Sequence, residues 1–317
     1  MLFEKAINLI KNSERIAIAC HVNPDADTVG SALALSLAIK KSGKTADILS
    51  ADPIGSRLLY LPGSDTVNVR THEAYDLFIF VDCSERARIG SSERFIGKAK
   101  TLVIDHHKSA VCNSDECIIK SNISSASEMI FMLIEEWDES FFDKDIATNI
   151  FAGKVSDTGN FSFPAVTADT HKIAARLFGY GIDSSDIFYN INKKKTKNEF
   201  ELYARVLSKA KFYSEDRVAV ITFRLKDFQE TGTDTFATEG VVNSVLNVDT
   251  VLVGVAVTEK DNGCYKFSIR SKDYVDAGDI AATFGGGGHR YAAGCRLYGC
   301  FEEVLEKILK ACADRLR

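Results

Sequence analysis

The sequence predicts an α/β protein in which a doubly wound, mostly parallel sheet is followed by a smaller α+β domain. In the first half of the chain, short β-branched runs alternate with helical patterns, as they do in βαβ units. A polar, lysine-rich stretch ends this alternation, and the strands and helices beyond it come in a different order. The length of 317 residues favours two domains, because single hydrophobic cores stop growing at roughly 250 to 300 residues.

The first domain is expected at residues 1–187 and contains four short strands. They are expected at residues 15–20, 45–49, 77–82 and 100–105. Apolar side chains recur at helical spacing in residues 30–42 and 127–137, which predicts two helices packed on the sheet. A linker is expected at residues 188–198, where the sequence NKKKTKN suits a solvated hinge. The alternative is that these lysines line a cleft between the domains and attract phosphate.

The second domain is expected at residues 199–317. Its elements are a helix at 199–213, strands at 218–223, 250–258 and 265–270, and a closing helix at 301–317. Four consecutive glycines start at Gly285, and their backbone entropy makes a helix or strand unfavourable there. We therefore expect a loop, either a phosphate-binding nest of backbone amides or a flexible surface turn.

Composition and charge exclude several classes of protein. With 45% hydrophobic and 26% charged residues, the chain resembles an ordinary globular protein. Charges interrupt the N-terminal segment where a signal peptide needs its apolar stretch, and no apolar run approaches the roughly 20 residues that cross a bilayer, so we expect a cytoplasmic protein without a membrane partner. The net charge of −5 argues against a surface that grips long nucleic acids. The eight cysteines form no CxxC pair and are expected to be free thiols.

Acidic and histidine residues follow the predicted strands, where ligands bind in open α/β sheets. They are His21, Asp25, Asp27, Asp82, Asp105, His106 and His107, and Asp157 follows a helical stretch. Singly, the aspartates could cap helices and the histidines could be core or surface residues. Capping does not place such residues after several strands at once, so we predict a metal site. Carboxylates with one or two imidazoles suit divalent ions, Mn²⁺ above all.

Four short motifs in this order carry a family resemblance. HxNPDxD starts at His21, VDxS at Val81, DHH at Asp105 and DTG at Asp157. Together they resemble the DHH phosphoesterase superfamily. Beyond the linker, SIRS at residues 268–271 and GGGGHRYAAG at residues 285–294 resemble the DHHA1 substrate-binding domain. The combination resembles the NrnA-type oligoribonuclease and pAp phosphatase branch of this superfamily.

The resemblance implies two divalent cations, Mn²⁺ first and Mg²⁺ or Co²⁺ as alternatives. The implied ligands are His21, Asp25 and Asp82 for one ion, and Asp27, Asp82, His106 and Asp157 for the other. Asp82 would bridge the ions, and a metal-activated water would attack phosphorus. His107 would contact the substrate phosphate or protonate the leaving group, with support of a metal ligand as the alternative. Asp105 would orient the histidines.

The same resemblance places substrate recognition in the second domain, across an interdomain cleft from the metals. The implied residues are Arg270, Ser271, Gly286, Gly287, Gly288, His289 and Arg290. Arg270 and His289 would hold a phosphate or nucleobase end of the substrate, a task that suits the forked guanidinium of arginine.

The expected activity is hydrolysis of short oligoribonucleotides or of 3′-phosphoadenosine 5′-phosphate (pAp), with short RNA or a small nucleotide as partner. A cyclic-di-AMP or linear dinucleotide phosphodiesterase would use the same residues and stays an alternative. A RecJ-like exonuclease is less favoured because no OB-fold extension follows. The GGGGH motif weighs against a family II-type pyrophosphatase, and the intact ligand set weighs against a non-catalytic nucleotide-binding regulator. Cleavage polarity and a homodimeric state are left open at this point.

Overall fold

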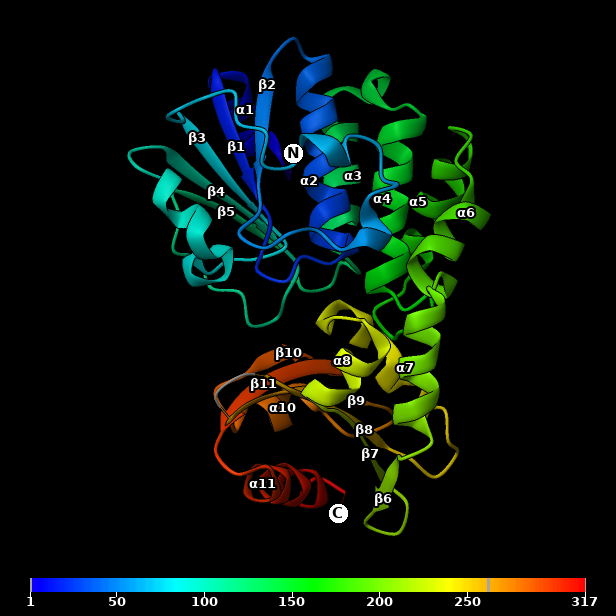
Figure 1. Ribbon diagram of the computed structural model, residues 1–317. Coiled ribbons are helices and arrows are strands. Elements are labelled where there is room, and N and C mark those ends of the chain that lie inside the picture. Colours follow the sequence, from blue (N-terminus) through cyan, green and yellow to red (C-terminus); the bar gives the residue numbers. More distant parts are fainter. Residues whose placement is uncertain (1, 261–262, 317) are drawn as a thin grey trace. The chain divides into compact units, whose positions relative to one another are not determined.

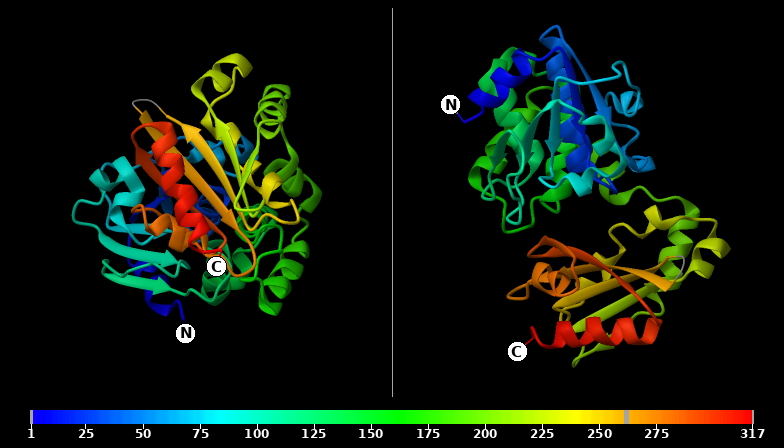
Figure 2. Two further views of the ribbon diagram at one scale, coloured as in Figure 1. Left: turned by 90° about the horizontal axis from the view of Figure 1, so that it is seen from below. Right: turned by 90° about the vertical axis from the view of Figure 1, so that its left-hand side faces the viewer.

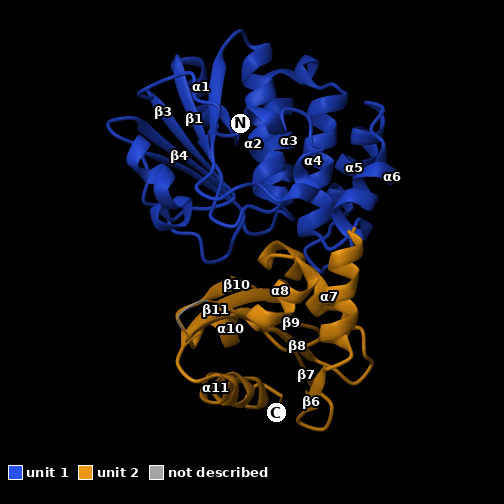
Figure 3. Ribbon diagram, in the orientation of Figure 1, with its two compact units in different colours: residues 1–194 blue, residues 195–317 orange. Residues whose placement is uncertain are grey.

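The computed structural model describes residues 2–260 and 263–316, and it divides the chain into two compact units at residues 1–194 and 195–317 (Figures 1 and 3). Of the residues 188–198 that were expected as a linker, Tyr189–Lys193 form a π-helical turn, and the first helix of unit 2 begins at Lys197. Among the described residues, no helix is long and apolar enough to cross a membrane.

Unit 1 contains a five-stranded, fully parallel sheet, which confirms the predicted α/β class. Its strands are β1 (Arg15–Ala19), β2 (Thr45–Leu49), β3 (Leu77–Val81), β4 (Lys100–Asp105) and β5 (Glu116–Ile119), in the order β2-β1-β3-β4-β5. The short strand β5 was not predicted. The chain leaves β1 toward one edge of the sheet and returns to β3 on the other side. Ligands bind at the carboxyl ends of strands at such a reversal in open α/β sheets.

The helices of unit 1 cover the sheet unequally (Figure 1). They are α1 (Glu4–Lys11), α2 (Ala26–Lys41), α3 (Ala126–Asp138), α4 (Lys144–Asp157), α5 (Ala168–Phe178) and α6 (Ser184–Phe188). Ile16 and Ile18 of β1 belong to the large core formed with α1 to α4. Phe78 and Phe80 of β3 point to the opposite face and pack with Ile89, in 3₁₀ turns over Arg86–Phe95. Both faces of the sheet are therefore buried, as expected for a parallel sheet.

Unit 2 contains a six-stranded mixed sheet (Figure 2). Its strands are β6 (Lys211–Tyr213), β7 (Val218–Phe223), β8 (Val253–Glu259), β9 (Cys264–Ser271), β10 (Gly287–His289) and β11 (Ala292–Tyr298), in the order β10-β11-β9-β8-β7-β6. Only β7 and β8 are parallel neighbours among these strands.

Helices pack on both faces of the second sheet. They are α7 (Lys197–Leu207), α8 (Leu225–Thr231), α9 (Val241–Leu246), α10 (Ala277–Ala282) and α11 (Phe301–Ala313). One apolar core joins β7, β8 and β9 to α10 and α11. Another core joins β7 and β8 to α7, α8 and α9 on the other face. On that second face, β9 and β11 contribute no residue to a hydrophobic cluster of the described residues.

Two sequence-based expectations for unit 2 were wrong. The helix expected at 199–213 ends at Leu207, because Lys211–Tyr213 pair with β7 as an antiparallel strand. The glycine run is not entirely a loop, since Gly287–His289 form β10. Glycine suits this strand because a Cβ on Gly288 would lie 2.5 Å from the carbonyl oxygen of Ala292 in β11. Close approach of two backbones outweighs the entropic cost of glycine here.

The expectation of free thiols also fails for one pair of cysteines. Cys112 and Cys117 form a disulfide, because the segment between β4 and β5 folds back and brings their Cα atoms within 5.8 Å. This distance is within the usual range for a disulfide. The other six cysteines are free thiols.

Candidate metal centre

The carboxyl ends of the parallel strands bring the acidic and histidine residues of unit 1 together. His21 comes shortly after β1, Asp82 directly follows β3, and His106 directly follows β4. Asp27 lies in the first turn of α2 and is fully buried, whereas Asp157 is the last residue of α4. Five elements of unit 1 thus converge on one cluster at the strand ends.

Asp82 lies between two sets of ligand atoms. Its Oδ2 is 3.3 Å from His21 Nε2, and its Oδ1 is 3.3 Å from His106 Nε2. Single donor atoms of His21, Asp25 and Asp82 lie within 4.8 Å of one another, and so do those of Asp27, His106 and Asp157. The first group has the three residues implied for one ion, and the second has three of the four implied for the other, without Asp82.

The backbone and environment of Asp82 fit a cation ligand. Its φ is +60°, in the left-handed region that costs a non-glycine residue energy and clusters at functional sites. The side chain is buried, and Oδ1 accepts no hydrogen bond from any described residue. A buried carboxylate oxygen without a donor is costly unless a cation compensates it.

The two buried histidines are oriented for metal binding. Nδ1 of His21 lies 2.9 Å from the carbonyl oxygen of Val22, and Nδ1 of His106 lies 3.2 Å from that of Ile123. A carbonyl can only accept, so each Nδ1 carries the hydrogen. In the neutral ring, Nε2 then presents its lone pair toward the carboxylates, which is the tautomer that a metal ligand requires.

Burial and mutual repulsion perturb the carboxylates strongly. Burial and the charge of Asp82 raise the pKa of Asp27 to about 6. Burial also raises the pKa of Asp157 well above its usual value, against the opposing effect of His106. For Asp82, burial favours the neutral form, yet the neighbouring rings of His106 and His21 hold its pKa well below the usual value. Crowded acids with divergent pKa values are typical of functional sites, and divalent cations would relieve their repulsion.

Asp27 is held in place by two other helices. Its carboxylate accepts hydrogen bonds from the backbone N–H groups of Ala126, at 2.7 Å, and Ser127, at 2.9 Å. These amides lie at the N-terminus of α3, where the helix dipole favours a negative charge. On α4, a Cβ at Gly153 would lie 2.7 Å from Asp27 Oδ1, so only glycine fits. This role of Gly153 was not predicted, although a glycine inside a helical pattern was the available signal.

A buried ion pair beside Asp27 was also missed. Lys154 of α4 is fully buried, and its Nζ lies 2.6 Å from Oε2 of Glu128 in α3. The hydroxyl of Ser124 donates to the same oxygen at 2.5 Å. The charge of Asp27 acts on Lys154 as well, against the effect of burial, which lowers the pKa of the lysine. Only the interior position of a lysine in a mostly apolar helix could have indicated this pair.

Asp25 and Asp105 have local roles that the structure shows directly. Oδ1 of Asp25 accepts hydrogen bonds from the N–H groups of Asp27 and Thr28 at 3.0 and 3.1 Å, so this residue does cap α2. The same oxygen lies 3.8 Å from His21 Nε2. Oδ1 of Asp105 lies 2.7 Å from His107 Nδ1, which is the geometry of a carboxylate that orients an imidazole.

In unit 2, the strand register brings two of the expected substrate-binding residues into one row, which means a set of residues paired directly across neighbouring strands. Arg270 of β9 pairs with Ala292 of β11, and Ala292 pairs with His289 of β10. Directly opposed residues in antiparallel strands project to the same face. Arg270 and His289 therefore flank the small side chain of Ala292 on one face of this sheet.

The remaining expected residues of unit 2 lie differently. The Ser271 hydroxyl is buried and donates to the carbonyl oxygens of Val275, at 2.9 Å, and Arg290, at 3.0 Å, which gives it a structural role. The guanidinium of Arg290 stacks 5.4 Å from the ring of Tyr291. Gly286 and Gly288 pack tightly against β11, whereas a Cβ on Gly287 would meet no atom within 4 Å.

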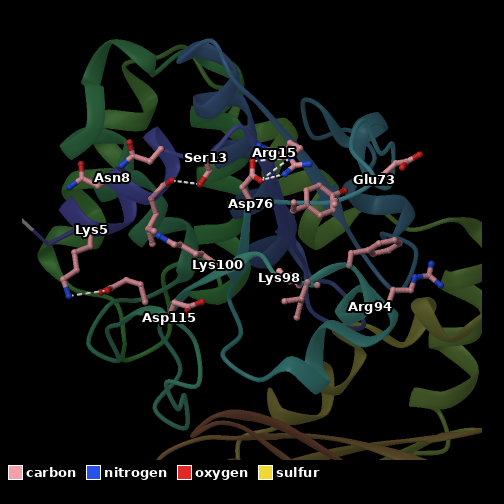
Figure 4. A pocket seen from close by; sticks show the side chains of 18 residues that line it. Lys5, Asn8, Ser13, Arg15, Glu73, Asp76, Arg94, Lys98, Lys100 and Asp115 are labelled. Atoms are coloured by element: carbon pink, nitrogen blue, oxygen red, sulfur yellow. Dashed lines mark hydrogen bonds and ion pairs between the residues drawn. The ribbon is translucent and has the colours of Figure 1, made fainter.

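A pocket of about 980 Å³ in unit 1 does not coincide with the metal-ligand cluster (Figure 4). It is lined by Arg15 at the start of β1, Asp76 just before β3 and Lys100 at the start of β4. These are the amino ends of the strands, whereas the candidate ligands follow the carboxyl ends. Arg15 and Asp76 form an ion pair with each other at 2.5 Å within this pocket. The chemistry of the ligand cluster, rather than the size of this pocket, identifies the candidate site.

We expect the affinity of the metal-free protein for Mn²⁺ to fall as the pH falls below about 9, where His21 binds a proton, and to fall more steeply below about 6. Asp27 has a pKa of about 6, so below that pH a bound proton must leave before the carboxylate can hold a cation. Each displaced proton weakens binding about tenfold per pH unit below the pKa. Titration calorimetry at pH 7.0 and 5.0 measures this change, and two buffers of different ionisation enthalpy count the released protons. Equal affinity at both pH values would contradict the assignment of Asp27.

Comparisons with known proteins agree with this geometry. Residues 15–154 match the DHH family, N-terminal domain, and residues 216–317 match the DHHA1 domain. The bifunctional oligoribonuclease and PAP phosphatase NrnA of Thermus thermophilus is 29% identical over 308 residues, which cover 95% of this chain and 90% of that protein. The protein of the same name from Bacillus subtilis is 29% identical over 294 residues, covering 92% of each.

Solved structures show the same similarity. An exopolyphosphatase-related protein from Bacteroides fragilis is similar with a TM-score of 0.90 at 25% identity, covering 99% of this chain and 96% of that one. RecJ from Thermus thermophilus in complex with Mn²⁺ has a TM-score of 0.60 at 14% identity, covering 99% of this chain and 54% of RecJ. At this lower identity the likeness to RecJ shows a common fold.

Proposed function

Because this chain belongs to the DHH/DHHA1 family of metal-dependent phosphoesterases, we propose that it hydrolyses short oligoribonucleotides and pAp at the candidate metal centre. The position of Asp82 between two groups of ligand atoms is the observation that carries this proposal. The two relatives named as oligoribonuclease and PAP phosphatase support the substrate class, since they cover 95% and 92% of this chain.

Each group of ligand atoms would hold one divalent cation, with Mn²⁺ proposed ahead of Mg²⁺ or Co²⁺. His21, Asp25 and Asp82 would hold one ion, and Asp27, Asp82, His106 and Asp157 the other. Such ions would lower the pKa of an attacking water and polarise the phosphoryl oxygens. The protein's own contribution is rigidity, because helix α3 and Gly153 leave Asp27 little freedom to move.

His107 would act on the leaving group. With Asp105 bound to its Nδ1, the ring is oriented so that Nε2 is the position that can donate a proton. Transfer of that proton to the departing ribose oxygen would avoid release of an unprotonated alkoxide. Arg270 and His289, which share one row of the second sheet, would bind a substrate phosphate.

The substrate class is tested with the full-length chain and Mn²⁺ on a panel of substrates. The panel contains di- to pentaribonucleotides, pAp, cyclic dinucleotides and pyrophosphate, with products separated by ion-exchange chromatography. We expect turnover of the short oligoribonucleotides and pAp. Turnover confined to cyclic dinucleotides would replace the proposal by the alternative phosphodiesterase, and turnover confined to pyrophosphate would contradict both.

Replacing Arg270 with alanine should raise the KM for these nucleotides by about tenfold or more, because a charge-assisted hydrogen bond contributes roughly 1.5 to 3 kcal/mol. The kcat/KM for a chromogenic phosphodiester without a nucleoside should change less than about twofold, since that substrate is bound at the metals alone. Lys307→Ala, which removes an exposed charge from α11, is the matched control. Equal losses on both kinds of substrate would place Arg270 in the hydrolytic chemistry instead.

A further inference from the structure

Three rows of side chains share one face of strands β9 and β11. The register pairs Arg270 with Ala292, Ser268 with Gly294, and Lys266 with Arg296. Along β9, half-buried residues alternate with buried ones, and the buried set belongs to the core under α10 and α11. The face with the three rows is therefore the one that these two helices do not cover.

The row of Lys266 and Arg296 places two cations directly opposite each other. Side chains of opposed residues on neighbouring strands have Cβ atoms about 4.5 to 5.5 Å apart, and like charges in such pairs destabilise a sheet. Neither Lys266 nor Arg296 forms an ion pair with any carboxylate among residues 2–260 and 263–316. Burial together with Lys260, Arg296 and Arg270 lowers the pKa of Lys266, and Glu239 opposes this only partly. The positive charge of this row is therefore not neutralised within the sheet.

The row between the two cationic rows is made of small residues. Ser268 and Gly294 lie side by side there, and Gly287 of β10 pairs with Gly294. Without bulky side chains, a sugar or a base can lie flat on the backbone between the rows. Arg270 and Lys266 are four residues apart along β9, which separates their rows by about 13 Å at the usual rise of a strand.

We propose that Lys266 and Arg296 form a second phosphate-binding subsite, which selects oligoribonucleotides over single nucleotides. This inference rests on the proposed function, since it takes the row of Arg270 and His289 as the first phosphate subsite. The two phosphates of a single nucleotide such as pAp are joined through one ribose and cannot reach both rows. Phosphates that are separated by two riboses in a longer chain can, so the second subsite acts on oligoribonucleotides alone.

Direct binding tests the subsite independently of hydrolysis. A fluorescently labelled tetraribonucleotide is titrated with the full-length protein in EDTA, and pAp is used as a competitor. We expect the double variant Lys266→Gln/Arg296→Gln to bind the tetraribonucleotide about tenfold or more weakly, because two charge-assisted contacts are lost. The affinity for pAp should change less than about twofold. The dependence of tetraribonucleotide binding on salt should also become shallower, as expected when fewer phosphates are neutralised.

Two controls make the outcome decisive. The charge-conserving variant Lys266→Arg/Arg296→Lys should keep most of the affinity, and Lys307→Ala on the opposite face should keep all of it. The glutamine variants should unfold at the same or a higher temperature than the wild type, since they remove a repulsive pair.

Equal weakening for pAp and the tetraribonucleotide, or no weakening for either, would overturn the second subsite. Wild-type binding of the tetraribonucleotide in EDTA without cleavage in Mn²⁺ would refute the proposed function and leave the subsite standing.

Discussion

Replacing Asp82 with asparagine is expected to lower kcat by on the order of 10³-fold or more, because several kcal/mol of transition-state stabilisation depends on both metal ions. Asparagine tolerates the left-handed backbone that Asp82 adopts, so the turn after β3 should stay intact. The side chain would lose the negative charge that faces His21 on one side and His106 on the other.

The stoichiometry of Mn²⁺ binding separates a bridging role from a general loss of folding. Titration calorimetry should find two ions bound to the wild-type protein and at most one bound tightly to the Asp82→Asn variant. Asp65→Asn is a suitable control, because this aspartate is exposed in a 3₁₀ turn between β2 and β3. Two tightly bound ions and normal turnover in the Asp82→Asn variant would contradict the bridging assignment.

Replacing Lys154 with methionine is expected to destabilise the metal-free protein by about 3 to 5 kcal/mol, the usual cost of leaving one member of a buried ion pair without its partner. Glu128 would keep its hydrogen bond from Ser124 but lose its cation in a buried position. Urea unfolding of the variant measures this loss as a lower transition midpoint.

The double variant Lys154→Met/Glu128→Gln shows whether the pair itself is responsible. Its loss of stability should be smaller than the sum of the two single losses, because no charge is left buried alone. Losses that add up fully would show that Lys154 and Glu128 stabilise the protein independently. Lys172→Met, which breaks an exposed pair with Asp169, should cost less than about 1 kcal/mol and serves as the control.

The candidate ligands and the parallel sheet could be predicted from local patterns. Alternating β-branched runs and helical spacing indicated four of the five strands of unit 1, and the polar residues that follow them indicated where a site would lie. The carboxyl ends of parallel strands share one edge, so sequence position after a strand translates directly into spatial proximity. For this reason the sequence alone places His21, Asp82 and His106 in one group.

Contacts between distant segments could not be predicted in this way. The Cys112–Cys117 disulfide, the pairing of Lys211–Tyr213 with β7 and the glycine strand β10 all depend on how chain segments meet in space. Each of them overruled a local preference: isolated cysteines suggested thiols, a helical pattern suggested a longer helix, and four glycines suggested a loop.

By itself, the sequence determined the fold class and the chemical types of residue at the carboxyl ends of the strands, because both follow from periodicity and from positions next to strands. Only the tertiary structure decided that Lys154 meets Glu128 beside Asp27, and that Lys266 lies opposite Arg296. The physical reason is that partner choice between helices and register between strands are set by packing and hydrogen bonding between segments far apart in the chain. Local spacing carries no information on such pairs.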